Sequence, residues 1–109
     1  MAYDEALAER IRGVLAQRDG VSERKMFGGI AFMVGGNMAC GVMGRELMVR
    51  VGPDAHDAAL AEPHVREMDF SNRPMRGFIY VALDGVASDD DLSRWVDAGV
   101  GYALSLPPK

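Results

Sequence analysis

Few residues of this chain have the types and spacing that metal chemistry requires. The two histidines, His56 and His64, are eight positions apart with Pro63 between them, so they do not share a helical face. No Cys-x-x-Cys or His-x-x-x-His pattern is present, and a metal site would need carboxylates from distant segments. We therefore expect no metal and no other cofactor, with both histidines at the surface or at a helix end.

Nucleophilic catalysis has no better support in the sequence. Cys40 is the only cysteine, it lies among small and apolar residues, and no basic residue close in sequence would lower the pKa of its thiol. None of the serines sits in a Gly-x-Ser-x-Gly elbow. We predict a buried, structural Cys40 and a protein that is not an enzyme, with no catalytic residues.

The segment Lys25-Met-Phe-Gly-Gly-Ile-Ala-Phe32 places two glycines inside a run that otherwise indicates a β-strand. Strands usually avoid glycine, which loses much backbone entropy on ordering. A phosphate loop would lead into a helix N-terminus, whereas these glycines lead into more strand. Two interpretations remain: a bulge or bend where a helix crosses the sheet, or a small ligand-binding cleft beside Phe27, Gly28 and Gly29.

Basic and methionine residues provide a second candidate site. Met48 and Arg50 share one face of an alternating strand, and other methionines lie near glycines or turns. Methionine and arginine are both common where proteins bind one another, although methionines also fill cores and arginines are often simply solvated. The candidate partner-binding residues are Lys25, Met26, Phe27, Gly28, Gly29, Met48, Arg50, Arg73, Met75 and Arg76.

Composition limits the function classes. The 109 residues are 49% hydrophobic and 26% charged, which fits one globular domain over 1–109. No apolar run is long enough to span a bilayer, and the acidic start is unlike a signal peptide, so we expect a cytoplasmic protein without membrane contact. The net charge of −4 disfavours nucleic acid as a partner. That alternative would use a basic sheet edge formed by Arg24, Lys25, Arg45, Arg50, Arg73 and Arg76.

Hydrophobic periodicity and turn residues predict the order of elements. Expected helices run from Asp4 to near Gly20, from Pro53 to Pro63 and from Ser88 onward, with Ser88 as the cap of the last helix. Expected strands cover 25–34, 38–43, 46–51, 66–70 and 77–83. The last helix should bury Leu92, Trp95, Val96, Val100, Ala103 and Leu104, with close packing or a bend at Gly99 and Gly101. This order, α-β-β-β-α-β-β-α, predicts an α+β two-layer sandwich with an antiparallel five-stranded sheet.

Several uncommon segments in this order resemble the TfoX N-terminal domain family, which includes the Sxy/TfoX regulators of bacterial competence. They are Met1-Ala2-Tyr3-Asp4, Met26-Phe27-Gly28-Gly29, Gly36-Asn37-Met38, Leu47-Met48-Val49-Arg50-Val51, Met68-Asp69-Phe70, Arg73-Pro74-Met75-Arg76-Gly77-Phe78, Tyr80-Val81 and Trp95-Val96. The resemblance implies a fold similar to secretion chaperones and a stand-alone, single-domain member. It implies no catalytic residues, since none is established in the family.

In the longer regulators this domain precedes a helical domain, and the complete protein acts with a transcription factor at competence promoters. The resemblance therefore implies a regulatory or adaptor domain that acts through protein–protein interaction, with a link to transcription or competence regulation. Its protein partner is not identified by the sequence. A homodimer is the favoured oligomeric state, because sheets in such folds often pair across an exposed edge.

Overall fold

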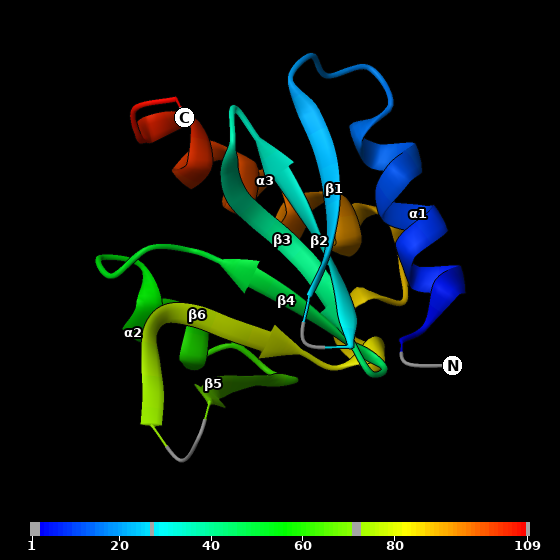
Figure 1. The fold of residues 1–109 in the computed structure, drawn as a ribbon. Coiled ribbons are helices and arrows are strands. Elements are labelled where there is room, and N and C mark those ends of the chain that lie inside the picture. Colours follow the sequence, from blue (N-terminus) through cyan, green and yellow to red (C-terminus); the bar gives the residue numbers. More distant parts are fainter. Residues whose placement is uncertain (1–2, 27, 71–72, 109) are drawn as a thin grey trace.

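The computed structural model describes residues 3–26, 28–70 and 73–108. Within these ranges the chain forms a mixed α+β fold, as predicted, with helices packed on a strongly twisted antiparallel sheet (Figure 1). The helices are α1 (Glu5–Leu15), α2 (His56–Leu60) and α3 (Asp89–Ser105), with a 3₁₀ turn η1 (Leu83–Val86). The strands are β1 (Val21–Met26), β2 (Gly29–Val34), β3 (Asn37–Met43), β4 (Glu46–Arg50), β5 (Val65–Phe70) and β6 (Arg73–Val81).

The sheet has the strand order β1-β2-β3-β4-β6-β5, and every neighbouring pair is antiparallel. The apolar strand β6 is an inner strand, whereas β1 and β5 form the two edges. Among the described residues the sheet has six strands rather than the predicted five. The additional strand arises because the segment expected as one strand over 25–34 folds back on itself.

That reversal explains the glycine pair. Met26 pairs with Gly29, so β1 and β2 form a hairpin, and Gly28 lies in the connection between them. Gly28 has φ +77°, a value that glycine adopts at little cost. At Gly29 a Cβ atom would lie 2.3 Å from the carbonyl oxygen of Val42. The expected bulge or bend under a crossing helix is therefore wrong for this pair: one glycine makes a hairpin turn and the other allows close strand packing.

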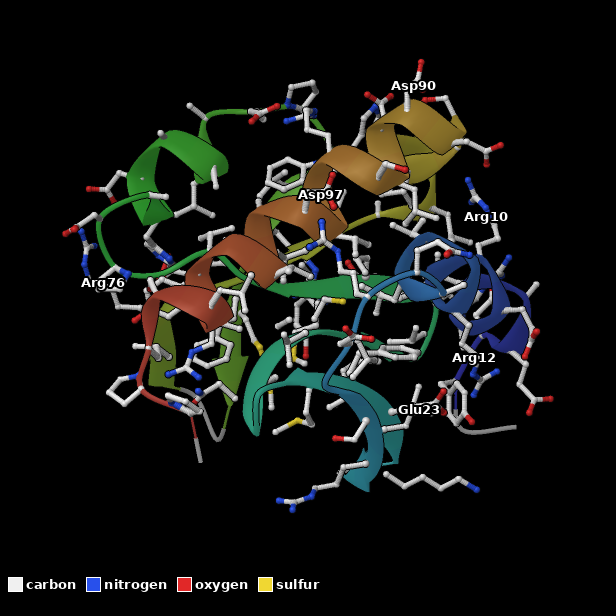
Figure 2. All side chains as sticks on the ribbon, turned by 90° about the horizontal axis from the view of Figure 1, so that it is seen from above. Arg10, Arg12, Glu23, Arg76, Asp90 and Asp97 are labelled. Carbon is white, nitrogen blue, oxygen red and sulfur yellow. The ribbon has the colours of Figure 1, made fainter. Side chains whose placement is uncertain are left out.

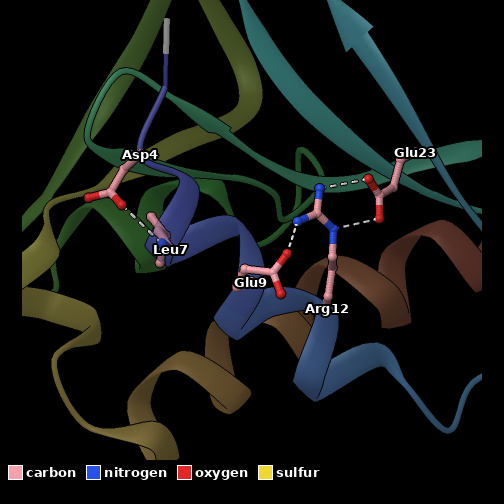
Figure 3. Close-up of polar contacts among 5 residues, drawn as sticks. All are labelled: Asp4, Leu7, Glu9, Arg12 and Glu23. Atoms are coloured by element: carbon pink, nitrogen blue, oxygen red, sulfur yellow. Dashed lines mark hydrogen bonds and ion pairs between the residues drawn. The ribbon is translucent and has the colours of Figure 1, made fainter. Parts of the chain in front are cut away.

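Side-chain caps begin the two long helices. Asp4 Oδ1 accepts a hydrogen bond of 3.0 Å from the backbone N–H of Leu7 at the start of α1 (Figure 3). Ser88 Oγ accepts one of 3.1 Å from the N–H of Asp91, as the sequence predicts. Helix α1 ends at Leu15, earlier than the expected stop near Gly20. Its Arg12 pairs with Glu9 and with Glu23 of β1, which ties the helix to the edge strand (Figure 3).

Helix α3 packs closely on the sheet at one of its two glycines. A Cβ atom at Gly99 would lie 2.2 Å from the carbonyl oxygen of Ala39, whereas one at Gly101 would meet nothing within 4 Å. The predicted core stripe of α3 is buried except for Leu104, which is 61% exposed. That part of the prediction is wrong because Leu104 lies about 110° around the helix from the middle of the buried stripe, farther than any residue within the stripe.

The main core lies between the helices and one face of the sheet. It includes Ile11 of α1, Val96 of α3, Ala59 of α2, and the inward side chains of the strands. Figure 2 shows α1, α2 and α3 gathered on one side of the sheet. Cys40 belongs to this core, as predicted, and burial raises the pKa of its thiol to about 12. The opposite side, here called the open face, lies away from these helices except at its rim, where Tyr102 of α3 reaches Arg50.

Candidate functional site

One row of residues crosses the whole open face. Strand pairing aligns Arg24 (β1), Ala31 (β2), Gly41 (β3), Met48 (β4), Tyr80 (β6) and Arg66 (β5). The row has an arginine on each edge strand and small or apolar residues between them. An antiparallel sheet with one solvated face usually carries polar side chains there, so the apolar middle of this row is unusual.

An apolar group of side chains, here called the methionine cluster, fills the middle of the open face. Met48, Met68 and Tyr80 are 3%, 5% and 8% exposed, and the partly buried side chains of Met38, Met43 and Phe78 pack against them. These side chains come from β3, β4, β5 and β6. The cluster is separate from the main core, because the sheet lies between the two.

Glycines beneath the methionine cluster let its side chains lie directly on the sheet backbone. A Cβ atom at Gly41 would lie 2.4 Å from the carbonyl oxygen of Ile30 and 3.0 Å from Cε of Met48. At Gly29 a Cβ atom would lie 2.5 Å from Sδ of Met43. The second glycine of the sequence motif therefore contributes to the candidate surface by making room for a methionine.

Arg50 lies at the rim of the methionine cluster, between rings from two layers of the fold. Its guanidinium carbon is 5.4 Å from the ring centre of Phe78 on β6 and 5.3 Å from that of Tyr102 on α3. Gly52 has φ +89°, and a Cβ there would lie 2.5 Å from the Tyr102 ring, so this glycine admits the tyrosine. Within the described part of the chain no carboxylate pairs with Arg50, which is half-buried.

Arg66 has a different environment. Its guanidinium lies 4.5 Å from the ring centre of Tyr80, and it donates two hydrogen bonds to the carboxylate of Glu46, one of them 2.9 Å long from Nε. Arg66 is thus neutralised by its own chain. Arg50 is the better candidate for receiving an external anion.

His56 supports the end of β4 from the helix side. It is 3% exposed, and its Nδ1 accepts a hydrogen bond of 2.9 Å from the N–H of Gly77. The carbonyl of Gly77 in turn accepts from the N–H groups of Val51 and Gly52. His56 lies at the start of α2, and a helix end was one of the two predicted locations. It helps to fix the backbone next to Arg50. His64 is exposed and has φ +68°.

The structure brings together only part of the predicted partner-binding set. Met48 and Arg50 share the open face, as predicted, and Gly29 contacts Met43 beside them. Lys25, on edge strand β1, pairs with Ile30 of β2, which belongs to the main core. Directly paired residues of neighbouring strands lie on the same face, so Lys25 is on the helix side of the sheet.

Arg76 reaches Asp57 of α2 at 3.4 Å. Figure 2 shows it on the side of the molecule opposite Glu23 of β1. Phe27 lies outside the described residues, as do the side chains of Met26, Arg73 and Met75. Lys25, Arg50 and Arg76 therefore do not form one basic patch.

Sequence reasoning missed the aromatic part of the site. Phe78 and Tyr80 are two residues apart on a predicted strand, and the outward position of Met48 on β4 could have indicated them as its neighbours. Met68 also lay in a predicted strand. Tyr102 had no such signal, since its contact with Arg50 depends on where α3 crosses the sheet.

A shallow hollow lies on the helix side. It is a groove of about 280 Å³ between α2 and α3, lined mainly by alanines and Trp95, with an Arg94–Glu62 ion pair beside it. Its volume is just below the range of small-molecule sites, which runs from about 300 to 1,000 Å³. Across residues 3–26, 28–70 and 73–108 no group of three or more His, Cys, Asp or Glu could hold a metal ion.

The described helices also include none with the length and apolar character needed to cross a membrane. The molecule is therefore an α+β domain with helices on one face of its sheet and a methionine-lined second face. A family model for the TfoX N-terminal domain matches residues 14–103, and the chain belongs to this family. Comparisons with curated proteins and with solved structures found no match.

Proposed function

We propose that this protein is a non-enzymatic regulatory or adaptor domain that binds a protein partner through the open face of its sheet. The family membership supports a regulatory role, with a link to transcription or competence regulation. We place its action in the cytoplasm. The observation that carries the proposal is the methionine cluster, an apolar group on the open face whose Met38, Met43 and Phe78 are only partly buried.

The chemistry of the cluster favours a protein ligand. Methionine side chains are unbranched and polarizable, so they adapt to the shape of a partner, and aromatic residues and arginine are enriched at protein interfaces. Met38, Met43 and Phe78 are only partly buried and would gain contacts from a bound segment. The buried Cys40 thiol, with its pKa raised to about 12, is a poor nucleophile and so fits a non-enzymatic role.

Nucleic acid fits the open face less well. Bases commonly stack on exposed aromatic rings, but guanidinium groups already lie over the rings of Phe78 and Tyr80. The net charge of −4 also opposes binding to phosphate backbones.

Photo-crosslinking in cells tests the proposal. A benzophenone amino acid placed at position 43 on the open face should yield a discrete adduct with another protein. The same group at position 104, the exposed leucine of α3, serves as the control and should give no comparable adduct. Adducts from position 104 alone, or from neither position, would contradict the proposed docking face.

A further inference from the structure

We infer that Arg50 binds a carboxylate of the partner, and that the partner segment is acidic with interspersed apolar side chains. This inference rests on the proposed function, because it assigns the chemistry of the partner that the open face receives. It follows from the charge of the face, the geometry of Arg50 and the position of the methionine cluster.

The described side chains of the open face carry the opposite charge to the protein as a whole. Arg24, Arg50 and Arg66 occupy open-face positions in the strand register, and among the side chains that the structure describes there, Glu46 is the acidic one. Glu46 is already paired with Arg66. A face with excess positive charge on a chain of net charge −4 favours an acidic partner and disfavours a basic one.

Arg50 is arranged to bind an anion. Contacts with Phe78 and Tyr102 hold the guanidinium in place, so less side-chain entropy is lost when an anion binds. The rings contact the π system of the guanidinium, whereas its N–H groups are the donors that bind a carboxylate in the two-point geometry typical of arginine. The N–H of Gly77 donates to His56, and its carbonyl accepts from Val51 and Gly52. These hydrogen bonds fix the backbone that follows Arg50 and so help to hold the guanidinium in place.

The methionine cluster accounts for the apolar part of the partner. Arg50 and Met48 are two residues apart on β4, so a segment with a carboxylate on Arg50 would place its neighbouring side chains over Met48 and Met43. An acidic residue and an apolar residue two positions apart in an extended segment match this spacing, because they lie on the same side of that segment. The occupant we propose is therefore an acidic, apolar protein segment and not a nucleic acid or a second copy of this chain.

Peptide titrations followed by NMR test the inference directly. The probes are three labelled hexapeptides: Glu-Ser-Leu-Ser-Phe-Ser, which carries its acidic and apolar side chains on one side when extended, the same sequence with Gln for Glu, and the same sequence with Lys for Glu. We expect the Glu peptide to shift amide signals of β4 and β6 and to bind at least about tenfold more tightly than the Gln peptide, the effect of losing one charge-assisted hydrogen-bonded pair.

Protein variants identify the arginine. Arg50→Gln should weaken the Glu peptide by about tenfold or more, Arg50→Lys by less, and Arg76→Gln should leave the affinity unchanged, because Arg76 pairs with Asp57 away from the cluster. Amide spectra of each variant show whether it is folded. The Glu-to-Gln comparison on the unchanged protein keeps the test valid if Arg50→Gln unfolds.

Three outcomes would overturn the inference. The first is equal binding of the Glu and Gln peptides, or shifts confined to the helix side. The second is tighter binding of single-stranded DNA than of the Glu peptide at the same salt concentration. The third is a dimer mass of the isolated protein by light scattering, together with concentration-dependent shifts of the β4 and β6 amide signals. The proposed function is judged separately. If open-face crosslinks persist in Arg50→Gln, the docking face is still supported, and the proposed contact between Arg50 and a partner carboxylate is contradicted.

Discussion

Substitution of Gly99 by alanine is a severe test of how α3 packs on the sheet. The new Cβ would lie 2.2 Å from the carbonyl oxygen of Ala39 and 2.9 Å from its carbonyl carbon. Both neighbours are backbone atoms of β3, which cannot rotate away, so the helix or the strand must shift. The matched control is Gly101→Ala, two residues along the same helix, where a Cβ would meet nothing within 4 Å.

The two substitutions should change stability in opposite directions. Alanine improves helix propensity by up to about 1 kcal/mol at either position. At Gly99 the crowding should cost about 1–3 kcal/mol and outweigh this gain, so the free energy of unfolding should fall. At Gly101 the gain should remain, which stabilises the protein by about 0.5–1 kcal/mol.

Urea unfolding followed by circular dichroism measures both free energies of unfolding. A protein of this size should show a difference of several degrees in Tm between the two variants. Equal free energies of unfolding for Gly99→Ala and Gly101→Ala would contradict the close contact between α3 and β3.

Three further substitutions test local polar contacts by the same unfolding assay. His56→Ala should destabilise the protein by about 1–3 kcal/mol, because the buried N–H of Gly77 loses its acceptor, and a loss near zero would contradict this. Ser88→Ala should cost about 1 kcal/mol through loss of the α3 cap. Hydrogen bonds from Arg12 lower the pKa of Glu23 in the folded state, so their stabilisation is present above the unfolded pKa of about 4.3 and is lost as pH falls through the folded pKa. Arg12→Gln should therefore cost about 0.2–1 kcal/mol near neutral pH for this partly exposed pair, and the difference should vanish in acid.

Local signals in the sequence predicted much of the architecture. The Ser88 cap and the buried stripe of α3 follow from residue type and helical spacing, and the alternation of β4 placed Met48 and Arg50 on one face. The hairpin at Gly28 was missed, because apolar residues flank the glycine pair and no polar turn residues mark the reversal. Because that hairpin was predicted as one strand, the predicted sheet had five strands instead of the six that the described residues form.

The composition of the open face depended on tertiary structure that the sequence does not specify locally. Alternation shows that Leu47 and Met48 point in opposite directions, but not which of the two faces the helices. The contact between Arg50 and Tyr102 depends on the crossing of α3 over the end of β4. The burial of His56 depends on the bend at Gly77, which has φ +93°.

Methionine oxidation footprinting tests the central claim that the open face docks a partner, and it does not require the partner's identity. The purified protein and the protein at its native level in cells are treated with the same mild oxidant, and mass spectrometry measures sulfoxide at each methionine. We predict that Met38 and Met43, half-buried in the isolated protein, are protected in cells. Equal oxidation of both residues in the two settings would show that nothing covers this face and would contradict the account.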